Sequence, residues 1–83
     1  MQITLKLFAT LTDYLPAGAS GNQAEIEIGD TESIGALIER FRLPERLVHL
    51  VLVNGNYVAP GDRAAQQLKA GDQLAIWPPI AGG

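Results

Sequence analysis

The sequence predicts a single domain of the α+β class, in which one main helix packs on one face of a mixed β-sheet. Two early segments, residues 2–8 and 24–28, alternate between apolar and polar side chains, which is the period of a half-buried strand. Residues 30–43 carry apolar side chains at helical spacing instead, and further strand-like segments follow. A chain of 83 residues has room for one hydrophobic core.

The two early strands are expected to pair like the arms of a hairpin. Their apolar side chains fall on one face: Ile3, Leu5 and Leu7 in the first, and Ala24, Ile26 and Ile28 in the second. Between the strands, residues 8–15 could form a short helix that ends at Pro16, and residues 18–21 favour a loop because they are small.

The main helix is expected over residues 30–43. Its apolar stripe consists of Ile34, Leu37, Ile38 and Phe41, at spacings of three and four. Asp30 or Thr31 can accept a backbone N–H at its start, and Pro44 lies just past its end. Gly35 weakens the helix locally, and we expect its benefit to be a close approach of the helix to the sheet.

The second half of the chain contains three shorter strands. Residues 48–53 are apolar except for His49, which predicts a strand covered on both faces and central in its sheet. Asn54-Gly55 supplies a two-residue turn, from which the chain returns along residues 57–58. One helical turn is expected at residues 66–68, and a last strand at residues 74–76.

This order of elements is the arrangement of a β-grasp domain, with two strands before the long helix and three after it. Pro78-Pro79 ends the last strand. We therefore divide the chain into a β-grasp domain, residues 1–77, and a flexible tail, residues 78–83.

Composition excludes several classes of function. The net charge is −3 with only 6 Lys and Arg residues, which argues against binding to nucleic acid. The chain has no cysteine, so disulfides, thiol catalysis and thiolate metal sites are excluded. The start alternates instead of resembling a secretory signal, and no apolar run is long enough for a membrane span, so a cytoplasmic location is expected.

A conventional catalytic site is hard to assemble from these residues. His49 lies inside an apolar strand pattern, which favours a structural or surface histidine over an acid/base group, and one histidine cannot form a metal site. Glu25 and Glu27 share one strand face, where a solvated edge is a simpler interpretation than an acid/base pair. We expect no metal site and no bound cofactor.

The end of the chain has a different character. Two prolines favour an extended path, so the six residues from Pro78 can project on the order of 20 Å from the last strand. Gly82 and Gly83 lack side chains and could enter a narrow cleft, where the terminal carboxylate of Gly83 has a free oxygen to attack phosphorus. A partner that brings ATP could convert this carboxylate into an acyl adenylate.

Trp77 stands at the base of the tail. If Leu74 and Ile76 point inward, Trp77 points outward, where it could form a docking patch with Ile80 and Tyr57. The alternative is that Trp77 folds back over the edge of the sheet.

The last ten residues, Leu74-Ala75-Ile76-Trp77-Pro78-Pro79-Ile80-Ala81-Gly82-Gly83, resemble the C-terminus of the MoaD/ThiS family of ubiquitin-like sulfur carriers. The Gly71-Asp72 turn before them and Val53-Asn54-Gly55 are also similar to the family pattern. The order of elements extends the resemblance over nearly the whole chain. Pro78-Pro79 and the length look more like MoaD, the small subunit of molybdopterin synthase, whereas the last four residues are shared with ThiS-like chains.

The resemblance implies a cycle in which a ubiquitin-activating-type enzyme uses MgATP to adenylate Gly83, and a sulfurtransferase or cysteine desulfurase system then forms a thiocarboxylate. Gly82 and Gly83 are the reacting end, and the partner-binding residues are Trp77, Pro78, Pro79, Ile80 and Ala81. The sulfur goes to a molybdopterin precursor on a large MoaE-like synthase subunit, or to the thiazole of thiamine on a thiazole synthase. The chain is then a carrier without catalytic side chains, although it can count as a synthase subunit.

Two other classes of function stay open. An amine could attack the same activated carboxylate, which would make the chain a protein modifier that forms isopeptide bonds. The chain could also be a plain interaction module whose terminal glycines are incidental.

Overall fold

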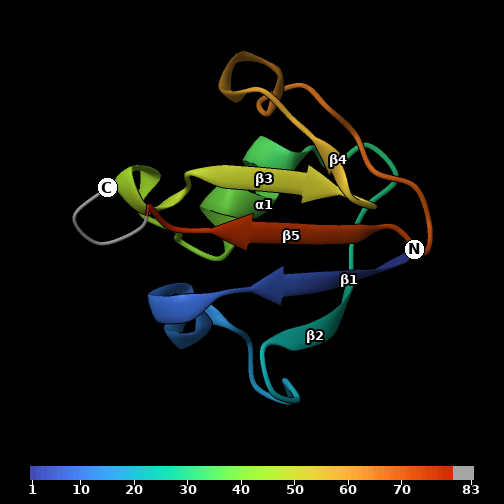
Figure 1. Ribbon diagram of the computed structural model, residues 1–83. Coiled ribbons are helices and arrows are strands. Elements are labelled where there is room, and N and C mark those ends of the chain that lie inside the picture. The colour runs from blue at the N-terminus through green and yellow to red at the C-terminus, as the bar shows by residue number, and fades with distance from the viewer. Residues whose placement is uncertain (80–83) are drawn as a thin grey trace.

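In a computed structural model of the protein, which describes residues 1–79, five strands form one sheet and one α-helix lies against it (Figure 1). The strands are β1 (Gln2–Leu7), β2 (Gln23–Glu27), β3 (Leu50–Val53), β4 (Asn56–Tyr57) and β5 (Gln73–Trp77). The helix α1 spans Ile34–Arg40, and three short 3₁₀ helices lie in the connections: η1 (Ala9–Tyr14), η2 (Glu45–Leu47) and η3 (Pro60–Asp62).

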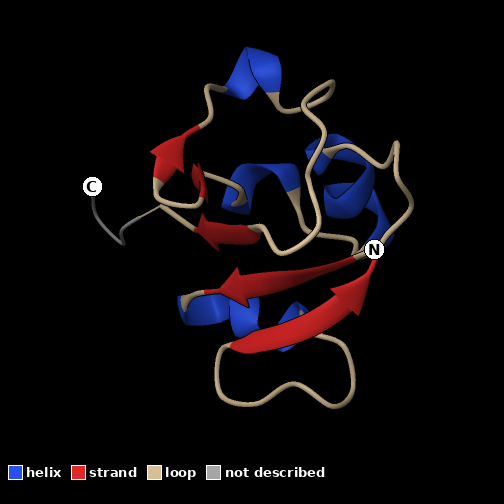
Figure 2. Cartoon of the chain, turned by 90° about the vertical axis from the view of Figure 1, so that its right-hand side faces the viewer, coloured by secondary structure: helices blue, strands red, loops and turns tan. Residues whose placement is uncertain are grey.

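The strand order across the sheet is β2-β1-β5-β3-β4. The central pair, β1 and β5, is parallel, and the other neighbours are antiparallel, so the sheet is mixed. Because β1 and β5 run in the same direction, Met1 lies at one end of the sheet and β5 finishes at the other (Figures 1 and 2). This is the β-grasp arrangement that the sequence predicted.

The core fills the space between α1 and the face of the sheet that the helix covers. The side chains that are almost fully enclosed in this core come from β1, η1, β3, β5 and α1: Ile3, Leu5, Leu7, Leu11, Val51, Leu74, Ile76, Ile34 and Leu37. They include the predicted apolar positions of the first and last strands. Ile38 and Phe41 of the helix stripe are partly buried and pack against this core. The alternation of each strand therefore predicted correctly which side chains face inward.

The central strand is β5, not the apolar segment 48–53. Residue 48 follows the end of η2, β3 begins at Leu50, and β3 lies one strand in from the edge. The prediction was wrong because Leu50 and Leu52 are apolar but only half-buried, on the sheet face away from α1. A strand that is apolar on both faces need not be central if one of those faces is open.

The helix α1 is shorter than predicted at both ends. Ser33, not Asp30 or Thr31, caps its start, because the Ser33 side chain accepts a hydrogen bond of 3.1 Å from the Ala36 N–H. Arg42 adopts a positive φ of 58° just past the helix, and the Leu43 N–H donates to the Ile38 carbonyl at 3.0 Å. This left-handed closure at Arg42 ends the helix at Arg40, four residues before Pro44.

Gly35 permits a close approach, but its neighbour is not the sheet. A Cβ on Gly35 would lie 2.9 Å from the Cα of Ala64, in the segment after η3. The Gly35 N–H also donates to the Arg63 carbonyl at 2.8 Å. The glycine therefore lets the start of α1 contact a loop backbone, which the sequence alone did not indicate.

The connection before β5 contains no helical turn at residues 66–68. The Gln66 carbonyl accepts a hydrogen bond of 2.9 Å from the Ile34 N–H, and Gln67 forms an isolated bridge with Ser33. These backbone groups satisfy the start of α1, so they do not form a helix of their own. The predicted turn at Asn54-Gly55 is confirmed, because both residues have positive φ, 51° and 84°.

Over residues 1–79, no helix has the length and apolar character that crossing a lipid bilayer requires.

Candidate functional site

The tail leaves the body of the protein at the end of the central strand. The Phe8 N–H donates to the Ile76 carbonyl at 3.2 Å, and the His49 N–H donates to the Trp77 carbonyl at 3.0 Å. Hydrogen bonds from both sides therefore hold the last residues of β5. Pro78 is half-buried and Pro79 is exposed, so the chain emerges from the surface at this point.

Four residues of the predicted site lie outside the described residues: Ile80, Ala81, Gly82 and Gly83. The predictions that Gly82 and Gly83 react, and that Ile80 and Ala81 contact a partner, therefore stay predictions. What the structure provides is the end of β5 with Pro78 and Pro79, which precede these residues.

Trp77 is half-buried and stacks on Phe8. The two ring centroids are 4.0 Å apart and the ring planes differ by 10°. Trp77 thus points away from the core as the strand phase predicted, but it does not stand alone on the surface, because Phe8 covers one of its faces. The parallel register that pairs Leu7 with Ile76 places the next residues, Phe8 and Trp77, side by side.

Sequence reasoning did not select Phe8 as part of the site. The residue follows the last position of β1 and keeps an extended backbone, with φ −119° and ψ 153°, so it continues the alternation onto the face opposite the core. That part could have been predicted. Its contact with Trp77 depends on the parallel pairing of β1 and β5, which no local pattern in either strand reveals.

An apolar patch extends from this stacked pair across the open face of the sheet. The register pairs Leu50 with Trp77, and Leu52 with both Ala75 and Tyr57, so these side chains share the face away from α1. We call the following set the open-face patch: Phe8, Leu50, Leu52, Tyr57, Ala75 and Trp77. Its members are half-buried except Tyr57, which is 59% exposed. A continuous apolar surface of this kind is typical of a docking site for another protein.

Tyr57 belongs to the patch but is not an immediate neighbour of Trp77. Strand β3 lies between β4, which carries Tyr57, and β5. Trp77 and Tyr57 therefore share one face of the sheet, as predicted. They are not neighbours, because Leu50 and Leu52 of β3 lie between their strands.

The titratable side chains that the sequence analysis considered, those of Glu25, Glu27 and His49, form no reactive pair with one another. Glu25 accepts a hydrogen bond from the Thr4 hydroxyl at 2.9 Å, and Glu27 forms an ion pair of 2.6 Å with the Met1 amine. This contact with Glu27 raises the pKa of the Met1 amine above its usual value. His49 is exposed. Within residues 1–79, no group of three or more His, Asp and Glu side chains could hold a metal ion.

The described part of the chain therefore offers a held strand end and an apolar docking surface beside it. It brings together Trp77, Pro78 and the newly found Phe8, with Pro79 leading outward. Such an arrangement can present a chain end to another protein.

Comparison with solved structures supports this view of the fold. The chain is 26% identical to SAMP1 from Haloferax volcanii, over 100% of both chains, with a TM-score of 0.68. It is 25% identical to a Pyrococcus furiosus protein assigned as subunit 1 of molybdopterin converting factor, over 95% of this chain and 98% of that one, with a TM-score of 0.67. No curated protein sequence matches the chain significantly.

A third similar structure is a protein–protein complex of subunits 1 and 2 of molybdopterin-converting factor from Helicobacter pylori. The matched chain is 18% identical over 100% of both chains, with a TM-score of 0.59, which supports the fold alone. The model of the ThiS family matches residues 5–83, a range that includes both terminal glycines. Because this match covers nearly the whole chain, the protein belongs to the ThiS family.

Proposed function

We propose that the protein is a sulfur carrier in molybdopterin synthesis, whose working group is the terminal carboxylate of Gly83. The observation that carries this proposal is the family match, whose range continues through Gly82 and Gly83 and so includes the tail. The similarity to the P. furiosus protein favours molybdopterin as the product, as does Pro78-Pro79.

The proposed chemistry takes two steps on partner enzymes. A carboxylate oxygen of Gly83 attacks the α-phosphorus of MgATP, pyrophosphate leaves, and an acyl adenylate forms. Sulfide then attacks the carbonyl carbon and displaces AMP, and the product is a thiocarboxylate. Where the donor is a persulfide on a sulfurtransferase, its outer sulfur displaces AMP and forms an acyl disulfide, and a second thiol of the partner attacks the sulfurtransferase sulfur, so that the thiocarboxylate is released and the two partner thiols are left as a disulfide. The carrier itself binds no cofactor in this scheme, since MgATP belongs to the activating enzyme. The metal and cationic groups that stabilise both steps are supplied there as well.

The fold suits a carrier because it separates docking from reaction. The open-face patch offers an apolar surface on a sheet that is held from both sides of β5, whereas the reactive end lies several residues farther on. The large synthase subunit and the activating enzyme can both dock against this surface while the tail enters their reaction chambers. Docking at Phe8, Trp77 and Leu50 then aims the tail, and burial of the tail keeps the thiocarboxylate away from water.

Mass spectrometry of the intact protein tests the proposal. After incubation with the host's adenylating enzyme, MgATP and a sulfur donor, the mass should rise by the difference between one sulfur and one oxygen. A fragment spectrum should place this change on Gly83. An unchanged mass, with an adenylating enzyme shown to be active on another carrier, would count against the proposal.

The recipient of the sulfur is tested separately. The thiocarboxylated protein should convert a molybdopterin precursor in the presence of a large synthase subunit. If it instead supports only a thiazole synthase, the chain serves thiamine synthesis, the other pathway that the family includes.

A second candidate function is protein modification, and the similarity to H. volcanii SAMP1 favours it. The acyl adenylate would in that case react with a lysine amine, which displaces AMP and forms an isopeptide bond. Conjugates of higher mass in a cell extract that contains the activating enzyme would support this function, and their absence together with thiocarboxylate formation would exclude it.

A further inference from the structure

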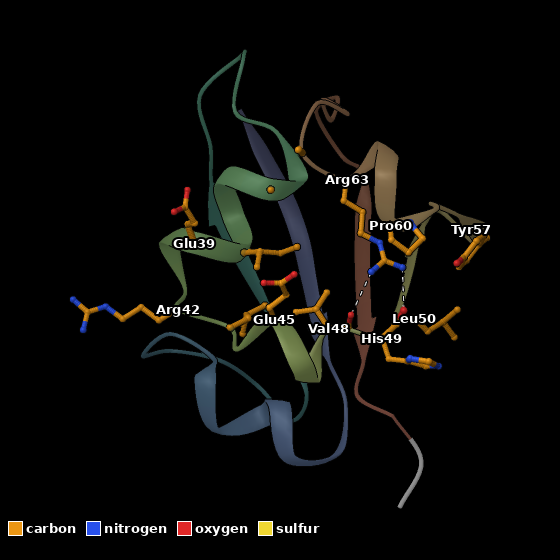
Figure 3. A pocket seen from close by; sticks show the side chains of 13 residues that line it. Glu39, Arg42, Glu45, Val48, His49, Leu50, Tyr57, Pro60 and Arg63 are labelled. Atoms are coloured by element: carbon orange, nitrogen blue, oxygen red, sulfur yellow. Dashed lines mark hydrogen bonds between the residues drawn. The ribbon is translucent and has the colours of Figure 1, made fainter. Parts of the chain in front are cut away.

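Next to the open-face patch, and sharing Leu50 and Tyr57 with it, lies a groove of about 910 Å³ bounded by α1, η2, β3, β4 and the segment around η3 (Figure 3). Apolar side chains of Ile38, Leu43 and Val48 line it. Apart from Leu50 and Tyr57 at its rim, the residues that line this groove have no part in the proposed carrier chemistry.

One buried cation, the guanidinium of Arg63, lines the groove, and it already donates hydrogen bonds to backbone carbonyls. Arg63 is 7% exposed, and its guanidinium donates to the carbonyls of Val58, Val48 and His49 at 3.1, 3.3 and 3.0 Å. These bonds join the loop around η3 to the start of β3, and Figure 3 shows two of them. Because its donors face backbone carbonyls, Arg63 is a structural element of the wall and little of its charge is available to a ligand.

Glu45 gives the groove its free charge. Its carboxylate points back between α1 and the Arg63 side of the groove, whereas Glu39 and Arg42 extend away on the outer wall (Figure 3). Glu45 is exposed, and its carboxylate takes part in no ion pair among residues 1–79. Glu39 and Arg42 carry opposite charges on the outer wall, so the groove's net charge comes from Glu45. An apolar groove of this charge complements a segment that carries apolar side chains and a single lysine or arginine.

The groove is also continuous with the base of the tail. His49 and Leu50 line it, the His49 N–H bonds to the Trp77 carbonyl, and Leu50 lies opposite Trp77 in the sheet. Figure 3 shows the chain leaving β5 below these residues. A protein that holds the tail beyond Pro79 therefore meets the mouth of the groove.

We propose that the groove is a second docking surface, and that its occupant is an apolar segment with one lysine or arginine, belonging to the enzyme that adenylates Gly83. This inference rests on the proposed function. The adenylating enzyme is the appropriate partner because molybdopterin synthesis, thiamine synthesis and protein modification would all require it. The groove then contributes to recognition before the tail reacts, and Glu45 selects the partner by charge.

Isothermal titration calorimetry with the adenylating enzyme tests this inference, using Glu45→Lys, Glu45→Gln and Asp30→Lys. Asp30→Lys is the matched control, because it makes the same charge change on an exposed residue that follows the end of β2, near Met1 at the opposite end of the sheet. We expect Glu45→Lys to weaken binding about tenfold or more, Glu45→Gln to weaken it less, and Asp30→Lys to change it less than about twofold. Thermal melting of each variant confirms that the fold is intact.

Equal affinities for the unaltered chain and Glu45→Lys would overturn the inference. So would an equal loss in Asp30→Lys, because the effect would then come from net charge and not from the groove. If the unaltered chain is adenylated normally in either case, the proposed function stands. If the unaltered chain is neither bound nor adenylated, the proposed function fails, and this inference fails with it.

Discussion

Phe8 and Trp77 stack with ring centroids 4.0 Å apart, and this contact joins the end of the first strand to the end of the last one. The residues are far apart in the sequence but adjacent in the parallel register of β1 and β5. Offset or parallel contacts between aromatic rings contribute about 0.5–1.5 kcal/mol beyond the area that they bury. The pair therefore fixes the direction in which the tail starts, at a modest energetic gain.

Phe8→Ala should expose the indole of Trp77 without unfolding the domain. Trp77 is the sole tryptophan of the chain, so its fluorescence reports this one position. We expect the emission maximum to move to longer wavelength in Phe8→Ala. Tyr57→Ala, which alters the same face two strands away, is the control and should leave the maximum unchanged. Equal emission from Phe8→Ala and the unaltered protein would show that the stack does not persist in solution.

Trp77→Ala should weaken binding to a large synthase subunit more than it lowers stability. The side chain is only half-buried, so its removal should cost about 1–2 kcal/mol of unfolding free energy. An aromatic anchor at the centre of an interface typically costs 2 kcal/mol or more when truncated, which corresponds to a loss in affinity of roughly thirtyfold or more. Chemical denaturation and calorimetry measure the two effects. A severe loss of stability with intact binding would assign Trp77 to the core.

Gly35→Ala should destabilise the protein, although alanine favours helices by about 1 kcal/mol over glycine. The new Cβ would lie 2.9 Å from the Cα of Ala64, a backbone atom that cannot move alone. We expect a net loss of about 1–3 kcal/mol of unfolding free energy, as in other overpacked sites. The control is Gly61→Ala, where a Cβ meets no atom within 4 Å. Stability equal to that of Gly61→Ala would contradict the close approach of α1 to this loop.

Arg63→Met should be among the most damaging single changes. It would leave three carbonyls, those of Val48, His49 and Val58, without the donor that they have in the structure. A buried acceptor that loses its partner costs about 1–3 kcal/mol, so the total should exceed about 2 kcal/mol even if water reaches part of the site. Arg46→Met is the control, since Arg46 is exposed. Urea denaturation of both variants measures the difference, and similar midpoints would refute the role assigned to Arg63.

The sequence could predict which side chains of a strand face the core, but it could not predict which strands lie next to each other. The alternation around Ile3, Leu5 and Leu7 correctly placed these side chains inside, because that pattern is local and burial follows from it. Strand order depends on contacts between distant segments, so the central position of β5 and the contact of Phe8 with Trp77 could not be read from either segment.

Errors at α1 have a similar cause. Asp30, Thr31 and Ser33 can all cap a helix, and the choice of Ser33 follows from the hydrogen bond between Ile34 and Gln66, which fixes where the first turn begins. The burial of Arg63 was also unpredictable, because an arginine becomes a core residue only where carbonyls from several segments meet. A local sequence pattern carries no information about such contacts between distant segments.

The central claim is that the carboxylate of Gly83 is the reacting group, and pyrophosphate exchange into ATP measures its adenylation directly. The chain ending at Gly83 should support exchange with the adenylating enzyme. A chain lacking Gly83, or one extended by a single residue, should support none, although both should melt at the same temperature as the unaltered protein. Exchange at an undiminished rate in either variant would contradict the account.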